Sequence, residues 1–122
     1  RQQEISQISR SLKNLAKEEF TNTANLYCDK LGVSYSKIKL RDPRSRWGSC
    51  SFNGNLMFSW RLIMAPKNII RYLVAHEVAH LEHFNHSIDF WTAVFFLFGP
   101  YENERKWLRT EGTKLHFYKF KG

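Results

Sequence analysis

Cysteine is scarce in this chain of 122 residues, which contains only two, Cys28 and Cys50. Two cysteines so far apart form neither a CxxC metal-binding pair nor a disulfide framework, so we expect both to be reduced thiols. Long apolar runs are missing as well: the longest, residues 93–98, is far shorter than the roughly 20 residues that span a membrane. The N-terminus carries no signal-peptide pattern. The sequence therefore predicts a cytoplasmic protein without a membrane partner.

Acidic residues are also few. The chain has 11 Asp and Glu against 19 Lys and Arg, which gives a net charge of +8. A basic balance favours anionic partners such as nucleotides or nucleic acid, although a solvated basic surface explains it equally well. With 43% hydrophobic residues, a chain of this length builds one core, so we expect a single domain over residues 1–122. It starts at Arg1 rather than at methionine, which is consistent with a fragment that lacks an N-terminal segment.

Apolar periodicity and turn signals predict an α+β fold. Apolar residues at three- and four-residue spacing indicate one long helix or two consecutive helices at the N-terminus. A three-stranded antiparallel sheet, a buried central helix and two C-terminal helices are expected to follow. These elements are predicted at residues 5–31, 36–40, 46–52, 55–62, 67–82, 87–98 and 102–115.

The pair Asn53-Gly54 is a strong signal for a two-residue hairpin loop between the last two strands. The register that follows pairs Trp47 with Trp60 on the apolar face and Arg46 with Arg61 on the other. Because like charges directly opposite each other are destabilising, either both arginines extend into water or an anion or carboxylate lies between them. Arg46 and Arg61 are therefore candidate substrate-binding residues.

The sequence HEVAH, from His76 to His80, places two histidines and Glu77 in an otherwise apolar segment. Burying such groups costs several kcal/mol each unless hydrogen bonds or a metal ion compensate. Residues four apart on a helix lie on one face, so both imidazoles can bind one zinc ion while Glu77 lies beside the water that the ion binds. The motif predicts a zinc hydrolase in which Glu77 is the catalytic base.

A catalytic zinc ion takes three protein ligands and keeps one position for water, so a third ligand is required. His86 follows the motif, and the polar residues on either side of it indicate a helix break that turns residue 86 back toward the metal. His83 lies on the same helical stripe but too far along the axis for a compact site. Glu102 and Glu104, from a later helix, are the alternatives, and we favour His86.

Three stretches, RWGSCSFNGNLMFSWRL, HEVAHLEHFNHSIDFW and GPYENERKWL, resemble the YgjP-like metallopeptidase domain, and the resemblance extends from about residue 20 to residue 120. This family is related to SprT-like proteases and consists of zinc hydrolases of the minimal zincin type. The resemblance implies a zincin-like fold, zinc as cofactor, His76, His80 and His86 as its ligands, and Glu77 as the catalytic base. Longer members carry an N-terminal β-rich segment that this sequence does not contain.

Three functions are compatible with these residues. The favoured one is a zinc-dependent metallopeptidase that acts on a peptide or protein substrate through a zinc-bound water activated by Glu77. In that case Arg46, Arg61 or Tyr101 would stabilise the oxyanion. The first alternative is a zinc-dependent hydrolase of phosphoanhydrides or nucleotides, in which the arginines hold phosphate oxygens. The second is a basic nucleic-acid-binding module with a structural zinc ion.

Overall fold

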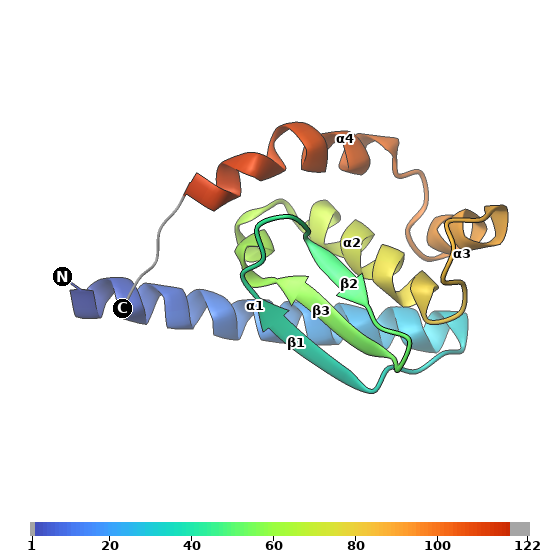
Figure 1. Cartoon of the computed structure of the whole chain (residues 1–122), viewed down its shortest axis with the longest axis horizontal. Helices are drawn as coiled ribbons and strands as arrows, with labels where there is room; N and C mark the ends of the chain where they lie inside the picture. The colour runs from blue at the N-terminus through green and yellow to red at the C-terminus, as the bar shows by residue number, and fades with distance from the viewer. Residues whose placement is uncertain (1, 118–122) are drawn as a thin grey trace.

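The computed structural model describes residues 2–117, and the rest of the predicted domain, residues 1 and 118–122, lies outside the described residues. Within residues 2–117 the chain forms four α-helices, a three-stranded sheet and two short 3₁₀ helices (Figure 1). The predicted α+β class is therefore confirmed. In chain order the elements are α1 (Gln2–Leu31), β1 (Lys37–Arg41), β2 (Gly48–Cys50), β3 (Asn55–Ser59), the 3₁₀ helix η1 (Trp60–Met64), α2 (Lys67–His80), α3 (Ile88–Phe98), α4 (Glu102–Thr110) and the 3₁₀ helix η2 (Gly112–Phe117).

Helix α1 is a single helix of 30 residues, one of the two arrangements that the periodicity allowed. One face is buried against the domain, with Ala16, Phe20 and Tyr27 at helical spacing. Gly32 ends the helix, because its φ of 78° lies in the left-handed region that favours glycine and its amide donates to the Cys28 carbonyl at 2.8 Å. The N-terminal end of α1 projects beyond the sheet and the other helices (Figure 1).

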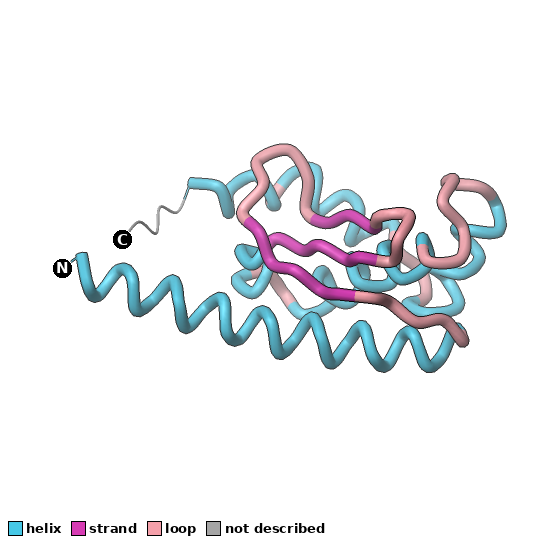
Figure 2. Tube along the Cα trace, turned by 60° about the horizontal axis from the view of Figure 1, so that its bottom comes forward, coloured by secondary structure: helices cyan, strands magenta, loops and turns pink. Residues whose placement is uncertain are grey.

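The sheet is mixed, so the prediction of an antiparallel sheet is wrong for β1. The strand order is β1-β3-β2 (Figure 2). β1 runs parallel to β3 and β2 runs antiparallel to it, as the arrows in Figure 1 show. β3 takes the centre because its Leu56 and Phe58 are fully buried, whereas β1 exposes Lys37, Lys39 and Arg41, which suit an edge strand. The chain reaches this arrangement by passing the end of β3 before it enters β2 on the far side.

The hairpin between β2 and β3 has a three-residue loop, not the predicted two-residue loop. The Ser51 amide donates to the Asn55 carbonyl at 2.9 Å, and Cys50 lies opposite Leu56. Gly54 has a φ of 82°, the left-handed conformation that ends a three-residue hairpin loop. The predicted register is therefore wrong by one residue, a shift that moves the residues of one strand to the opposite face of the pair.

Arg61 does not lie opposite Arg46, because β3 ends at Ser59 and the chain turns into η1. The Arg61 side chain is buried and donates twice to Asp42, from Nε to Oδ1 at 2.6 Å and from Nη2 to Oδ2 at 3.0 Å. Its Nη1 donates to the Leu115 carbonyl at 3.1 Å. Arg61 therefore joins η1 to the β1–β2 connection and to η2, three segments that are distant in the sequence.

We expect Arg61→Ala to lower the free energy of unfolding by about 2 kcal/mol. Removing one partner of a fully buried ion pair costs about 3–5 kcal/mol, and the Asp42 side chain is 40% exposed, which reduces that cost. Urea unfolding followed by circular dichroism measures the change. Arg46→Ala, at an exposed position, is the matched control and should unfold at the wild-type midpoint. Equal midpoints for the two variants would contradict the structural role of Arg61.

The helix that carries the motif and the two helices after it begin at or within one residue of the predicted positions, but two of them end earlier than predicted. α2 packs against α1, α3 and β2, and it ends at His80 rather than at residue 82. Ser87 caps α3 as predicted, because its hydroxyl accepts the Phe90 amide hydrogen at 3.3 Å. α4 ends at Thr110, earlier than predicted, and the chain continues as η2. None of the helices in residues 2–117 has the length and apolar character that crossing a membrane requires.

Candidate metal centre

Three imidazoles meet beside the C-terminal end of α2. His76 and His80 lie one turn apart on the helix, and their ring centroids are 5.0 Å apart. The His86 ring lies 5.3 Å from that of His76 and 4.9 Å from that of His80. One nitrogen from each ring lies within 4.8 Å of the other two. The structure therefore brings together the three residues that were predicted to bind zinc.

The turn after α2 explains how His86 reaches the helix. α2 ends at His80, and the His83 amide donates to the Ala79 carbonyl at 2.9 Å, which closes the last turn. α3 then begins immediately after its cap, Ser87. Because α3 packs against α2, the residue just before the α3 cap is held beside the end of α2.

The tautomer and charge of these imidazoles suit metal binding. His80 Nδ1 lies 3.0 Å from the His83 carbonyl oxygen; a carbonyl only accepts, so Nδ1 carries the hydrogen and Nε2 keeps its lone pair. Burial lowers the pKa of His80 below its usual value. Burial, and then the charge of His76, lower the pKa of His86 as well. Neutral imidazoles are the form that binds metal.

Two polar atoms beside the imidazoles are buried without a hydrogen-bond partner among the described residues, Glu77 Oε1 and His76 Nδ1. Glu77 is only 3% exposed, and its Oε2 lies 3.4 Å from His76 Nδ1. Buried polar atoms without partners are costly. A cation among the imidazoles, with water beside the carboxylate, would offset that cost. The donor set of three imidazoles next to a carboxylate fits a divalent metal ion, typically zinc.

Gly48 is a site residue that the sequence reasoning missed. A Cβ at this position would lie 3.0 Å from the Met57 carbonyl oxygen and 3.2 Å from Glu77 Oε2. An alanine here would force the Met57 carbonyl or the Glu77 carboxylate to shift by a few tenths of an ångström, so glycine lets β2 approach the carboxylate this closely without displacing it. The available signal was a glycine within a predicted strand, which often marks a close approach of another group.

A cavity of about 350 Å³ is lined by the three imidazoles, by Glu77 and by the Gly48–Cys50 edge of β2. Burial, followed by the negative charge of Glu77, raises the pKa of the Cys50 thiol to about 11. The Cys50 thiol of the metal-free protein therefore stays protonated at neutral pH, and Cys50 does not belong to the metal-binding group found in residues 2–117. The metal-binding group and the edge strand β2 therefore face the same cavity, and β2 contributes no fourth residue to the group.

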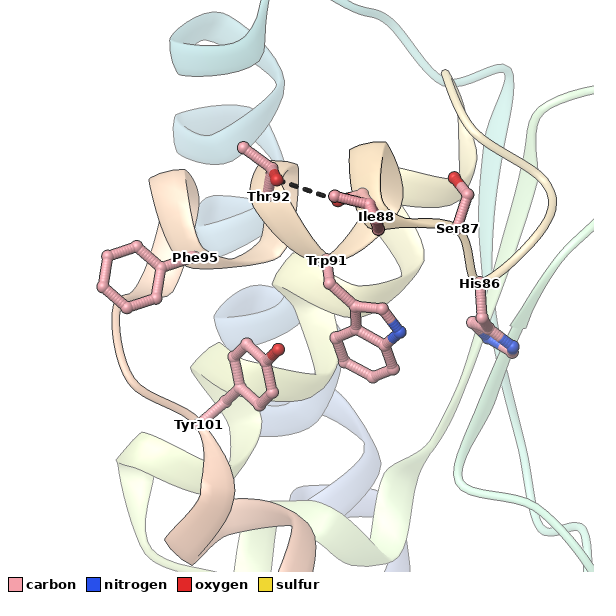
Figure 3. A pocket seen from close by; sticks show the side chains of 7 residues that line it. All are labelled: His86, Ser87, Ile88, Trp91, Thr92, Phe95 and Tyr101. Carbon is pink, nitrogen blue, oxygen red and sulfur yellow. Dashed lines mark hydrogen bonds between the residues drawn. The ribbon is translucent and has the colours of Figure 1, made fainter.

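A second cavity of about 510 Å³ shares His86 with the first and extends along α3 (Figure 3). Tyr101, predicted to stabilise an oxyanion, lines this second cavity, and its ring lies 4.9 Å from that of Trp91.

Tyr72, one turn before His76 on α2, has its ring 6.1 Å from that of Tyr101 and 6.0 Å from that of His76. Burial raises the pKa of Tyr72 to about 12, so its phenol stays neutral. Tyr72 is four residues before His76 on the same helix, and this spacing could have identified Tyr72 from the sequence as a neighbour of the metal-binding group.

The other predicted candidates lie outside the imidazole group. Glu104 is buried and accepts a hydrogen bond from Asn68 Nδ2 at 2.8 Å, and Glu102 is exposed at the start of α4. Neither glutamate belongs to the metal-binding group found in residues 2–117. Arg46 and Arg61 line neither of the two cavities that contain His86.

Comparison with known proteins agrees with this geometry. The sequence profile of the YgjP-like metallopeptidase domain matches residues 1–111. No curated protein matches the chain. Among solved structures, the chain is similar to the crystal structure of the metallopeptidase zymogen of Pyrococcus abyssi abylysin, with 22% sequence identity, a TM-score of 0.66, and coverage of 80% of this chain and 95% of that one. It is also similar to the metallopeptidase zymogen of Methanocaldococcus jannaschii jannalysin, with 19% identity, a TM-score of 0.61, and coverage of 78% and 94%.

The two structural likenesses confirm the expected zincin-like fold, and the sequence profile confirms the family that the three sequence stretches resemble. The profile spans most of the chain, including all three histidines and Glu77. The chain therefore belongs to the YgjP-like metallopeptidase family, whose members are hydrolytic enzymes.

Proposed function

We propose that this protein is a zinc-dependent metallopeptidase in which His76, His80 and His86 bind the metal ion and Glu77 is the catalytic base. The observation that supports this best is the convergence of three imidazole nitrogens, all within 4.8 Å of one another, beside a buried carboxylate. Three protein ligands leave one position of a tetrahedral ion for water, as catalytic zinc sites require. Membership of a metallopeptidase family makes a peptide or protein the expected substrate.

Each residue has a distinct part in the proposed reaction. When bound, the zinc ion supplies Lewis acidity, which polarises the scissile carbonyl and acidifies water. Glu77 accepts a proton from the attacking water and delivers it to the leaving amine. The carboxylate is confined between α2 and Gly48 of β2, so it stays beside the imidazoles through both transfers.

The β2 edge is the proposed binding site for the extended substrate. β2 is an edge strand of the sheet, and its three residues line the cavity that contains the histidines. An edge strand offers backbone N–H and C=O groups that an extended peptide can pair with. Of the residues predicted to stabilise the oxyanion, Tyr101 lies in a cavity that includes His86, so we propose Tyr101 for that role.

Two observations disfavour the alternatives. The phosphoanhydride alternative assigned Arg46 and Arg61 to the phosphate oxygens, and neither arginine lines the cavities beside the metal-binding group. A structural zinc site takes four protein ligands, and the group found among residues 2–117 holds three. Binding of nucleotides or nucleic acid by the basic surface stays a separate prediction.

Parallel incubations test the proposal directly. Purified, untagged protein is loaded with zinc and incubated with an unfolded protein and, separately, with nucleoside triphosphates. We expect fragments of the unfolded protein by mass spectrometry, their loss on treatment with a chelator, and their return when zinc is added back. Hydrolysis of the nucleotides alone would end the peptidase proposal.

The contact between Gly48 and Glu77 gives a further prediction. Gly48→Ala should lower kcat/KM for peptide cleavage by about tenfold or more, because small displacements of a catalytic group cost up to about 10²-fold. It should also lower the free energy of unfolding by about 1–3 kcal/mol through overpacking. Gly54→Ala is the control: its φ of 82° makes alanine costly, but it contacts no catalytic residue. Equal activity of the two folded variants would show that Gly48 does not position Glu77.

A further inference from the structure

The cavity along α3 presents apolar side chains next to the metal-binding group. Trp91 lies between His86 and Tyr101 in the close-up view (Figure 3), with its ring 5.8 Å from that of His86 and 4.9 Å from that of Tyr101. Ile88 is 86% exposed and Phe95 is 56% exposed. Apolar side chains gathered around a cavity of about 510 Å³ are typical of a binding site rather than of an ordinary surface.

A cation lies at the border of this cavity. The Arg105 guanidinium carbon is 4.7 Å from the centre of the Trp91 ring, and Arg105 is exposed on α4. The Trp91 ring on which it stacks lies 5.8 Å from the His86 ring, so the guanidinium lies close to the metal-binding group. A guanidinium stacked on an indole is held in place while its N–H groups remain available.

No carboxylate among residues 2–117 forms a hydrogen bond or ion pair with Arg105. Glu104, its neighbour in sequence, is buried and binds Asn68 instead. Glu102, one turn earlier on α4, is exposed and is not among the residues that form ion pairs in the described part of the chain. The Arg105 guanidinium is planar and positively charged, and it lies beside the candidate catalytic site without an acidic partner among the described residues. It is therefore complementary to a carboxylate on a ligand.

We propose that Arg105 binds a carboxylate of the substrate, and that the cavity along α3 takes an apolar side chain of the same substrate beside the scissile bond. This inference rests on the proposed peptidase function, because it assigns the substrate class of that site. The carboxylate belongs either to an acidic side chain or to the C-terminus of the peptide, and both sources present the same planar anion to the guanidinium. Arg105 and the cavity together select peptides that combine an apolar residue with a nearby negative charge.

Binding to a non-cleaving variant tests the inference without relying on turnover. Zinc-loaded Glu77→Gln protein is titrated into a fluorescein-labelled peptide containing phenylalanine, and fluorescence anisotropy gives Kd. Four peptides are compared, with Glu or Gln next to the phenylalanine and with a free or an amidated C-terminus. We expect a carboxylate to tighten binding by about tenfold, as charge-assisted hydrogen bonds do. The Glu and Gln pair reports the side-chain source, and the acid and amide pair reports the C-terminal source.

Substitutions of Arg105 in the same background assign the effect. Arg105→Gln should remove the preference for the carboxylate and leave Kd for the neutral peptide within about twofold, while Arg105→Glu should favour a lysine-containing peptide. Arg109→Gln removes one positive charge from an exposed position one turn later on α4 and should keep the preference. The inference is overturned if Glu77→Gln protein shows no preference, if the preference survives Arg105→Gln, or if that change weakens all four peptides equally.

Failure of the inference and failure of the proposed function have different signatures. If zinc-loaded wild-type protein cleaves peptides but cleaves carboxylate and amide versions equally, only the role of Arg105 is lost. If it cleaves no peptide while the Glu77→Gln protein still prefers the carboxylate in an Arg105-dependent way, the peptidase function is lost and the anion site remains.

Discussion

We expect Glu77→Gln to lower kcat/KM for peptide cleavage by about 10²- to 10⁴-fold, the range that a general acid–base group contributes. Glutamine keeps the size and shape of the side chain, so its contacts with β2 and with the neighbouring imidazole are retained. It cannot accept a proton from water, which removes the proposed step. Zinc content, measured by inductively coupled plasma mass spectrometry, should be unchanged because Glu77 is not a proposed ligand.

The fold should tolerate this change. Glu77 is 3% exposed, and its Oε1 has no hydrogen-bond partner among the described residues. Replacing a buried charge with a neutral amide removes a desolvation cost, so Tm of the metal-free protein should stay equal or rise. Glu82→Gln, at an exposed position just after α2, is the matched control and should keep full activity. Wild-type kcat/KM in Glu77→Gln protein would exclude Glu77 as the base.

His86→Ala should weaken zinc binding by more than about 100-fold. Loss of an outer-shell partner alone typically costs 10- to 100-fold in metal affinity, and the loss of a ligand exceeds that. His86 is exposed, so alanine leaves no void in the core, and the metal-free variant should unfold at the wild-type temperature. Competition with a chromophoric chelator measures the affinity, and peptide cleavage at limiting zinc should fall in parallel.

His83→Ala separates the role of His86 from a general effect of histidine loss. The His83 side chain does not belong to the metal-binding group found in residues 2–117, although its backbone carbonyl accepts the hydrogen bond from His80. Alanine keeps that carbonyl, so zinc affinity should remain at the wild-type value. If the two alanine variants bound zinc equally well, His86 would not be the third ligand.

Local signals in the sequence were sufficient for much of the candidate site. The four-residue spacing of His76 and His80 on one helix, and the end of that helix before His86, both depend on contacts within a few residues. The cap of α3 at Ser87 is local in the same sense, and the structure has it as predicted. The three imidazoles could therefore be grouped before any tertiary contact was known.

Contacts between segments that are distant in the sequence determined the strand order, the hairpin register and the partner of Arg61. The sequence of a strand does not determine which strands it pairs with, and β3 lies at the centre of the sheet, where its Leu56 and Phe58 are fully buried. The hairpin loop is one residue longer than predicted, so Arg46 does not lie opposite Arg61. Arg61 instead pairs with Asp42. Asp42 lies in the connection between β1 and β2, and the position of that connection depends on how the whole chain folds.

The sequence by itself thus determined the α+β class, the helix that carries the motif and the identity of the candidate ligands, because periodicity, capping and i, i+4 spacing are properties of short segments. Only the tertiary structure decided the strand order, the approach of Gly48 to Glu77 and the position of Arg105 over Trp91. These features join segments that are distant along the chain. Their geometry depends on which buried contacts win when the whole core packs.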